Sequence, residues 1–303
     1  HYNDKNLIEK VIRALSLLEM LVKAGCPLVF KGGTALMLIL GKSAHRLSID
    51  IDLICPPGTN IEDYLKSFAD FGFINLELVE RKQRDDADIP KSHSKFFYQI
   101  AYRNDTDAQS YILLDVLYED IHYFRTQQIA INCPFIRLEG KPLMVTVPSA
   151  EDILGDKLTA FAPNTTGIPY YKNGRSCSME IAKQLYDVGR LFENVSDLQI
   201  TKEAFRKIAV VELSYRSFGT DIGQVFNDIR QTALCISTRG KAGEGDFDLI
   251  QDGIIRVKSF MYKQRYLIDH AIIDAARAAY LATLIEKGIN EIESYSNNPA
   301  DIK

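Results

Sequence analysis

The spacing of apolar residues changes near Pro148, and this change limits the folds available to the chain. Before it, short apolar or alternating segments predict strands, and they cover residues 28–30, 47–54, 75–80, 96–102, 110–118, 129–131 and 144–147. Helical spacing in the same part of the chain covers residues 4–24, 35–40 and 61–71. After Pro148 helical spacing prevails, and it covers residues 150–161, 178–192, 201–217, 222–238, 246–258 and 263–294. We therefore expect an α+β fold, with a mixed sheet in an α/β domain over residues 1–148 and an α-helical domain over residues 149–303.

The charge of the chain is nearly balanced. Its 303 residues carry 36 Lys and Arg against 40 Asp and Glu, and the formal net charge of −4 divides evenly between the two halves. This balance excludes a protein that binds nucleic acid mainly through bulk positive charge, but it leaves room for a local basic groove. The longest uninterrupted apolar run, residues 35–40, is far shorter than the roughly 18–20 residues that a membrane span needs.

Cysteine and histidine usage points away from disulfides and zinc. The five cysteines are scattered without a Cys-x-x-Cys pair, and the five histidines have no paired spacing. Free thiols are typical of a reducing compartment, so we expect a cytoplasmic protein without a membrane partner. A zinc site is not expected.

The segment Lys31-Gly32-Gly33-Thr34 lies between a predicted strand and a predicted helix. Two glycines at such a point let the backbone approach a ligand closely. The helix that follows offers unpaired N–H groups and the positive end of its dipole, and the Thr34 hydroxyl adds a donor. The segment is therefore a candidate phosphate-binding turn.

Two carboxylates follow on the next predicted strand. Asp50 and Asp52 lie two residues apart, so both side chains point to the same face of the sheet. Adjacent carboxylates raise each other's pKa unless a cation lies between them. Mg²⁺ takes carboxylate oxygens together with substrate phosphates, so the pair predicts a magnesium site beside the phosphate-binding turn.

Asp115 interrupts the apolar segment 112–118, where an uncompensated acid is costly. One explanation is a solvated position at the edge or end of a strand. The other is a third metal ligand that also serves as a base for the attacking hydroxyl. Two metal ions about 4 Å apart would then activate the nucleophile and stabilise the leaving pyrophosphate.

The order of these segments resembles the polymerase-β-type nucleotidyltransferase superfamily, whose signature is Gly-Gly or Gly-Ser, then Asp-x-Asp, and later a third acid on a strand. Within it, residues 31–36 and 45–53 are similar to the AbiEii/AbiGii toxin family of bacterial abortive-infection and toxin–antitoxin systems. The resemblance implies a polymerase-β-like first domain and an enzyme that consumes a nucleoside triphosphate with Mg²⁺. Some members are thought to modify tRNA ends, and many are neutralised by a cognate antitoxin.

The resemblance continues into the helical half. Residues 150–158 are similar to the family's helix with a lysine, here Lys157, and residues 183–188 to its Arg-Asp-x-x-Asp-Leu segment. Asp187 matches that segment, whereas Lys183 and Gln184 stand where Arg and Asp are common. The resemblance implies site roles for Lys157 and Asp187.

The residues alone leave alternatives open for these charges. Lys157 is either a cation that holds the triphosphate or a solvated helix lysine. Asp187 is either a site residue or an intrahelical partner of Lys183 or Arg190. Arg46, just before the Asp-x-Asp strand, either contacts phosphate or forms a salt bridge with an acid.

The expected site has three overlapping groups. The catalytic residues are Asp50, Asp52, Asp115, Lys157 and Asp187. The nucleotide-binding residues are Lys31, Gly32, Gly33, Thr34, Arg46 and Lys157. The metal ligands, for a two-ion Mg²⁺ site, are Asp50, Asp52 and Asp115.

These expectations combine into a Mg²⁺-dependent nucleotidyltransferase whose helical domain closes the cleft. By family analogy the acceptor is RNA, in particular a tRNA 3′ end, and the protein is the toxin of a toxin–antitoxin or abortive-infection pair. An RNA acceptor calls for a basic strip, for which the candidates are Lys172, Arg175, Lys183 and Arg190. The alternatives are transfer to a protein or small molecule, and a non-catalytic module that binds a nucleotide or a partner.

Overall fold

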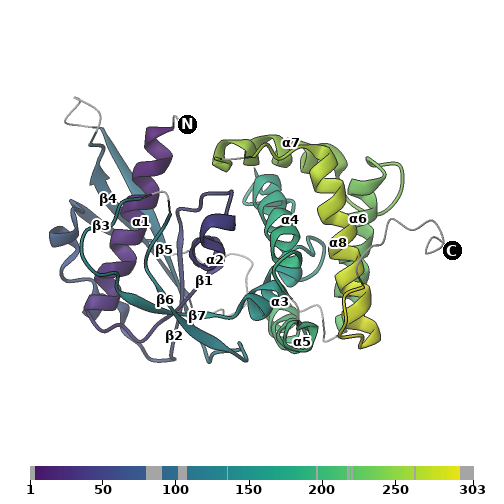
Figure 1. The fold of residues 1–303 in the computed structure, drawn as a ribbon, viewed down its shortest axis with the longest axis horizontal. Helices are drawn as coiled ribbons and strands as arrows, with labels where there is room; N and C mark the ends of the chain where they lie inside the picture. Colours follow the sequence, from purple (N-terminus) through teal and green to yellow (C-terminus); the bar gives the residue numbers. More distant parts are fainter. Residues whose placement is uncertain are drawn as a thin grey trace.

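The computed structural model describes residues 4–79, 91–101, 108–134, 136–195, 197–216, 219, 221–262 and 264–293. The main sheet and α1 (Lys5–Lys23) lie in one half of the molecule and most of the helices in the other, and the two halves lie side by side (Figure 1). The chain thus has the mixed sheet followed by helices that its sequence predicts, and the α+β fold class is confirmed.

The main sheet has five strands in the order β1-β2-β5-β4-β3. They are β1 (Val29–Lys31), β2 (Ile51–Cys55), β3 (Asn75–Val79), β4 (Lys91–Gln99) and β5 (Gln109–Tyr118). β2 and β5 are parallel and the other neighbours are antiparallel, so the sheet is mixed. Asp115 therefore lies on a central strand, which contradicts the edge position that one explanation of this acid required.

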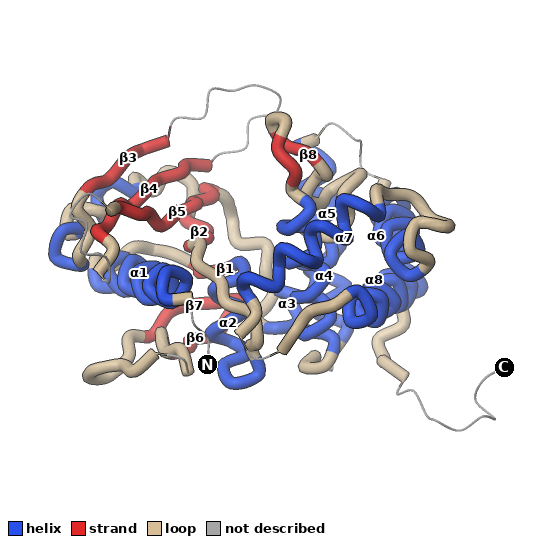
Figure 2. The backbone as a smooth tube through the Cα atoms, turned by 90° about the horizontal axis from the view of Figure 1, so that it is seen from above, coloured by secondary structure: helices blue, strands red, loops and turns tan. Residues whose placement is uncertain are grey.

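One face of this sheet packs against α1 (Lys5–Lys23), as the views in Figures 1 and 2 agree. Alternate residues of β5 point into that core, and they are Ile112, Leu114 and Val116. The residues between them, including Asp115, point to the opposite face because side chains alternate along a strand. On that opposite face, Ile54 of β2 packs with Ile208 of α5 (Leu198–Tyr215), so this face meets the helical half.

α2 (Gly32–Leu40) belongs to both halves. Met37 lies in the core under the sheet, whereas Leu36 lies in the core of the helical half. The helical half also contains α3 (Ala150–Ala160), α4 (Ser178–Phe192), α6 (Ile222–Ser237), α7 (Phe247–Val257) and α8 (Ile268–Lys287). Two short paired elements complete the fold, β6 (Thr126–Ala130) with β7 (Met144–Pro148) and the hairpin of β8 (Tyr171–Lys172) with β9 (Arg175–Ser176).

Most predicted elements are found within a few residues, but several differ. The helix predicted at 61–71 is wrong: two 3₁₀ turns, Ile61–Tyr64 and Phe68–Phe71, stand there instead. Ile61 and Leu65 are both buried and lie four residues apart. The short turns bury both side chains, so the apolar spacing alone did not distinguish them from an α-helix. α2 begins at Gly32 rather than at residue 35, and α8 is shorter than the predicted 263–294, whose two end residues lie outside the described part of the chain.

The strand predicted at 47–54 is also shorter, since β2 begins at Ile51 and Leu47 bonds to a different part of the chain. The Leu47 amide donates to the Phe260 carbonyl at 2.9 Å, and the Tyr262 amide donates to the His45 carbonyl at 3.1 Å. We call this contact of residues 45–47 with residues 260–262 the clasp. It ties the segment before β2 to the chain after α7. None of the described helices is both long and apolar enough to cross a membrane.

Candidate active site

Four neighbouring strands each place one polar residue at the same level of the sheet. Lys31 of β1 lies opposite Asp52, Asp52 lies opposite Asp115 of β5, and Asp115 lies opposite His93 of β4. Cross-strand partners point to the same face, and for Asp115 that face is the one turned away from α1. We call these four residues the charged row. It brings two of the three predicted acids together as neighbours on parallel strands.

The start of α2 lies directly against the row. Gly32 has a φ of +78°, and a Cβ built on it would lie 2.1 Å from the Asp52 Oδ2. Only glycine fits there, on both conformational and steric grounds. The buried Thr34 hydroxyl donates to the Asp50 carbonyl at 2.7 Å, so it holds the segment before β2 in place.

The negative charges of the site acids affect the pKa values of Asp50 and Asp52. Burial raises the pKa of Asp52 to about 7, and the neighbouring charges of Asp50 and Asp115 act in the same direction. Burial and Asp115 also raise the pKa of Asp50, although Lys183 opposes that shift. Negative charge at this place is therefore under-compensated, and an added cation would relieve it.

The donor chemistry of the row fits a hard divalent cation. Carboxylate oxygens are the protein ligands that Mg²⁺ prefers, and two of these carboxylates are adjacent in register beside a helix N-terminus. Within the described part of the chain, no group of three or more His, Cys, Asp or Glu side chains is arranged to hold a metal ion. Mg²⁺ sites commonly combine one or two protein carboxylates with oxygens from substrate phosphates.

A second cluster of charges lies buried between the halves. Arg46 makes a bidentate salt bridge to Asp187 of α4, with Nη2 at 2.9 Å from Oδ1 and 2.8 Å from Oδ2. The Lys157 ammonium lies 3.0 Å from Asp187 Oδ2 and donates to Gln184 Oε1 at 2.9 Å. Burial alone would raise the pKa of Asp187, but Arg46 and Lys157 hold it below its ordinary value. We call Arg46, Lys157, Gln184 and Asp187 the buried network.

This network excludes one alternative for Lys157 and one for Asp187. Lys157 is 6% exposed, so it is not a solvated helix lysine. Asp187 binds Arg46 and Lys157 rather than an intrahelical partner, and Arg190 instead pairs with Glu193 at 2.8 Å. The salt bridge considered for Arg46 is present.

Lys31, a member of the row, and Lys183, which lies outside it, have further partners. Lys31 lies 3.6 Å from Asp156 of α3, and the Tyr123 hydroxyl donates to the same carboxylate at 2.8 Å. Lys183 lies over the Phe260 ring at 3.9 Å from its centroid. Burial and Arg46 lower the pKa of Lys183 to about 8, while Asp50 opposes the shift. Lys183, whose role the motif left unassigned, is therefore a cation beside the acids.

His93 is a member of the row that the sequence did not reveal. Its Nδ1 contacts Asp115 Oδ1, and its Nε2 is buried without a hydrogen-bond partner among the described residues. A motif search could not identify it, because the pairing depends on the register between β4 and β5. The only sequence signal is a histidine near a predicted strand, which is weak.

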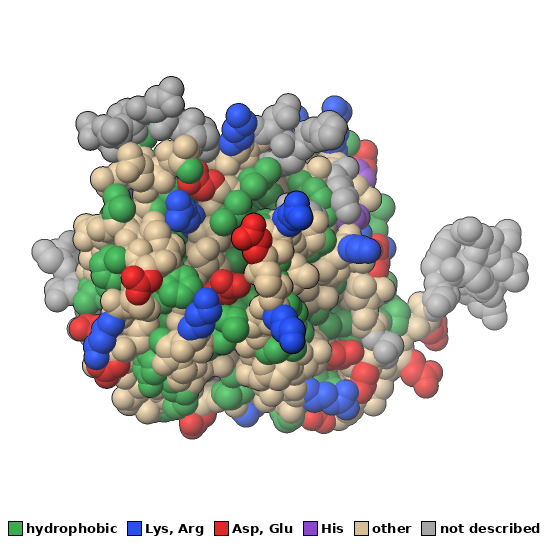
Figure 3. Space-filling view, turned by 60° about the vertical axis from the view of Figure 1, so that its left-hand side comes forward, with side chains coloured by type: hydrophobic (Ala, Val, Ile, Leu, Met, Phe, Trp, Pro, Cys, Tyr) green, Lys and Arg blue, Asp and Glu red, His purple; other side chains and the backbone are tan. Residues whose placement is uncertain are grey.

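The basic strip expected for an RNA acceptor is only partly present. Lys183 and Arg190 are engaged as described, whereas Lys172 and Arg175 lie opposite each other in the β8–β9 hairpin. Beside them Tyr171 is 57% exposed. On the face drawn in Figure 3, basic side chains are dispersed among acidic and apolar ones.

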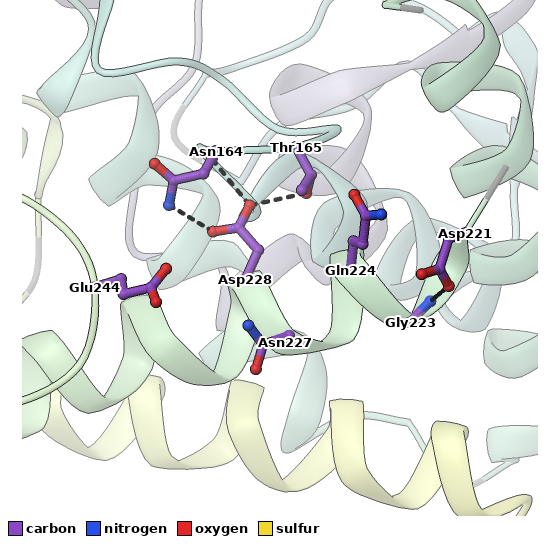
Figure 4. A pocket seen from close by; sticks show the side chains of 8 residues that line it. All are labelled: Asn164, Thr165, Asp221, Gly223, Gln224, Asn227, Asp228 and Glu244. Carbon is purple, nitrogen blue, oxygen red and sulfur yellow. Dashed lines mark hydrogen bonds between the residues drawn. The ribbon is translucent and has the colours of Figure 1, made fainter. Parts of the chain in front are cut away.

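A polar pocket in the helical half is separate from the charged row (Figure 4). It has a volume of about 320 Å³ and lies beside α6. Both carboxylate oxygens of Asp228 are occupied there, by Asn164 at 2.8 Å and by Thr165 at 2.8 Å. These bonds anchor the loop after α3 to α6, which is a structural role.

No curated protein sequence matches the chain. Among solved structures, JHP933 from Helicobacter pylori is 17% identical over 95% of this chain and 92% of its own, with a TM-score of 0.44. MenT4, a nucleotidyltransferase toxin from Mycobacterium tuberculosis, is 15% identical over 93% of this chain and 82% of its own, with a TM-score of 0.48.

A family model covers most of the sequence. It is described as the nucleotidyl transferase AbiEii toxin of a type IV toxin–antitoxin system, and it matches residues 15–278. The matched region includes both the charged row and the buried network. The chain therefore belongs to the AbiEii family of nucleotidyltransferase toxins.

Proposed function

We propose that this nucleotidyltransferase uses Mg²⁺ to transfer a nucleoside monophosphate from a nucleoside triphosphate to a hydroxyl of RNA, in particular a tRNA 3′ end. The observation that carries the proposal is the in-register pair of Asp52 and Asp115, with Gly32 against Asp52. The attacking oxygen forms a bond to the α-phosphorus, the bond to pyrophosphate breaks, and Asp115 accepts the hydroxyl proton.

The proposal assigns a role to each charged group. Asp50, Asp52 and Asp115 would hold Mg²⁺, which supplies charge stabilisation to the phosphates when bound. The N-terminus of α2 at Gly32 and Gly33 would receive phosphate oxygens. The cations that would balance the phosphate charge are Lys31 in β1, Arg46 in the clasp, Lys157 in α3 and Lys183 in α4.

Within this proposal Thr34 and Asp187 act through other residues. Thr34 holds the Asp50 carbonyl, and Asp187 holds Arg46 and Lys157 beside α2. Residues 1–148 then form the nucleotidyltransferase domain, and residues 149–303 form the domain that closes the cleft. The clasp and the buried network support this division, because both join the two halves at the site.

Transfer of label tests the reaction directly. Wild-type protein is incubated with each labelled nucleoside triphosphate, Mg²⁺ and total RNA, beside Asp52→Asn and the control Asp252→Asn. Asp252 is an exposed acid of α7 that pairs with Arg256 at 3.5 Å. We expect Asp52→Asn to lose at least about 100-fold in rate, since several kcal/mol of charge stabilisation are removed, and Asp252→Asn to match wild type. No transfer by wild type, or equal transfer by Asp52→Asn, contradicts the proposal.

The hairpin is the proposed contact for the RNA acceptor. Tyr171 offers an exposed aromatic face for a base, and Lys172 and Arg175 offer charge for phosphates. The hairpin also leads directly into α4, which carries Lys183 and Asp187. We expect Tyr171→Ala with Arg175→Glu to raise KM for RNA about tenfold and to leave KM for the triphosphate unchanged. Label found only on protein or on a small molecule would reject RNA as the acceptor.

A further inference from the structure

His93 is held against the third acid of the site by the sheet itself. β4 and β5 pair over nine consecutive residue pairs, from Lys91 opposite Leu117 to Gln99 opposite Gln109, and His93 stands directly opposite Asp115. The His93 side chain is 11% exposed, against 39% for that of Asp115. The imidazole is therefore largely shielded from solvent, and the carboxylate beside it is more exposed.

The contact takes up one side of the carboxylate. His93 Nδ1 contacts Asp115 Oδ1, and an ionised carboxylate is an acceptor only, so Nδ1 carries the proton and donates it. One oxygen of Asp115 is thereby fixed towards β4. The second oxygen remains for the side of β5 on which Asp52 lies in register.

The other ring nitrogen of His93, Nε2, is buried and makes no hydrogen bond to the described residues. A histidine held only for packing would more commonly satisfy both nitrogens. Among the described residues, the hydrogen bond of the His93 ring is made to Asp115 alone.

We propose that His93 is a positioning residue that orients Asp115 for binding a divalent cation between Asp115 and Asp52. This inference rests on the proposed metal-dependent function. Ligating carboxylates are commonly oriented by hydrogen bonds from behind, and loss of such a bond weakens metal affinity by about 10–100-fold. His93 touches neither substrate nor cation and acts only through Asp115.

Two amide variants separate positioning from packing. In His93→Asn the amide nitrogen can occupy the position of Nδ1, whereas in His93→Gln it reaches the position of Nε2. His93→Asn should therefore keep the bond to Asp115, and His93→Gln should lose it. The matched control is His270→Asn on α8, where His270 Nδ1 accepts from the Leu267 amide at 3.2 Å.

The readout is Mn²⁺ binding by electron paramagnetic resonance, without nucleotide or turnover. We expect His93→Gln to bind Mn²⁺ at least about tenfold more weakly than wild type, and His93→Asn and His270→Asn to bind it within about threefold of wild type. Thermal melting confirms that each variant is folded. Equal binding by His93→Gln and wild type overturns the proposal, as does equal weakening in both amide variants or no Mn²⁺ binding by wild type.

Catalysis is measured separately, so the two proposals can fail independently. If wild type binds Mn²⁺ in the predicted pattern but transfers no nucleotide, the proposed function fails and the role of His93 stands. If wild type transfers nucleotide and His93→Gln does so with an unchanged Mg²⁺ requirement, the role of His93 fails and the function stands.

Discussion

Two charged clusters meet at consecutive glycines and differ in how their charge is balanced. A Cβ on Gly32 would strike Asp52 of the charged row, and a Cβ on Gly33 would lie 2.9 Å from Nη2 of Arg46 in the buried network. In the network, Asp187 has two cations and a pKa below its ordinary value. In the row, Asp52 has two acid neighbours and a pKa raised to about 7.

This difference in charge balance suits the buried network to a structural role and the charged row to binding a cation. A fully paired buried cluster such as the network fixes the geometry of the two halves. An under-compensated cluster such as the row is ready for a cation and is less stable without one. The start of α2 lies against both clusters, because Asp52 lies close to Gly32 and Arg46 lies close to Gly33.

Breaking the network should have the largest effect on stability. Asp187→Asn leaves Arg46 and Lys157 buried without a counter-charge, so we expect a loss of about 3–5 kcal/mol in the free energy of unfolding. Urea denaturation measures it. The control is Glu193→Gln, which removes a partly exposed partner of Arg190 and should cost less than about 1 kcal/mol. Similar losses in both variants would contradict a special role for the network.

Disturbing the contact between α2 and the row comes next. Gly32→Ala places a methyl group on Asp52 at a φ of +78°, and we expect a loss of about 2–4 kcal/mol together with loss of nucleotide transfer. Gly25→Ala is the matched control, since Gly25 has a φ of +75° with nothing within 4 Å of an added Cβ. It should lose about 1–2 kcal/mol and keep its activity. Equal losses of stability and activity in Gly32→Ala and Gly25→Ala would contradict a role for the contact with Asp52.

Adding a cation should stabilise the row. At ten times its dissociation constant, Mg²⁺ should raise the free energy of unfolding of wild type by about 1.4 kcal/mol. Asp52→Asn should be more stable than wild type in chelator and should gain little from Mg²⁺, because the repulsion is already relieved. Chemical denaturation with and without Mg²⁺ provides the comparison. An equal gain in both proteins would place the cation elsewhere.

The two acids should also respond to pH in opposite ways. The pKa of Asp52 is raised to about 7 in the folded state. Its contribution to the free energy of unfolding is therefore largest below the pKa of the unfolded chain, and it declines as the pH rises from there towards 7. The lowered pKa of Asp187 means that its contribution is present above its unfolded value and is lost on acidification. Carboxyl NMR titration in chelator should show Asp52 ionising near 7 and Asp187 below the ordinary Asp value of about 3.9. Titration of both near 3.9 would remove the contrast.

The sequence predicted what depends on local pattern and missed what depends on register and distance. α4 matches its predicted range because its apolar stripe is regular. Asp52 lies in β2 as predicted, whereas Asp50 lies just before the strand begins. The partner of Arg46 lies 141 residues away, so the choice between phosphate and salt bridge stayed open. The contact of His93 with Asp115 depends on a strand pairing that spacing does not encode.

The truncation of the predicted 47–54 strand has the same cause. Leu47 begins the predicted strand, but its backbone partner is Phe260 of the clasp rather than a strand of the sheet. Local propensity identified the extended backbone and could not identify the neighbour. The helix predicted at 61–71 was wrong for the opposite reason, since two 3₁₀ turns satisfy the same apolar spacing locally.

Binding of a magnesium nucleotide tests the central claim most directly. Each of the four nucleoside triphosphates is titrated into wild type and Asp52→Asn by calorimetry, with Mg²⁺ and with chelator. Our account predicts that at least one triphosphate binds wild type only with Mg²⁺, and that Asp52→Asn weakens this binding at least about tenfold. Binding that ignores Mg²⁺, or that is equal in Asp52→Asn, would contradict the assignment of the charged row as the nucleotide site.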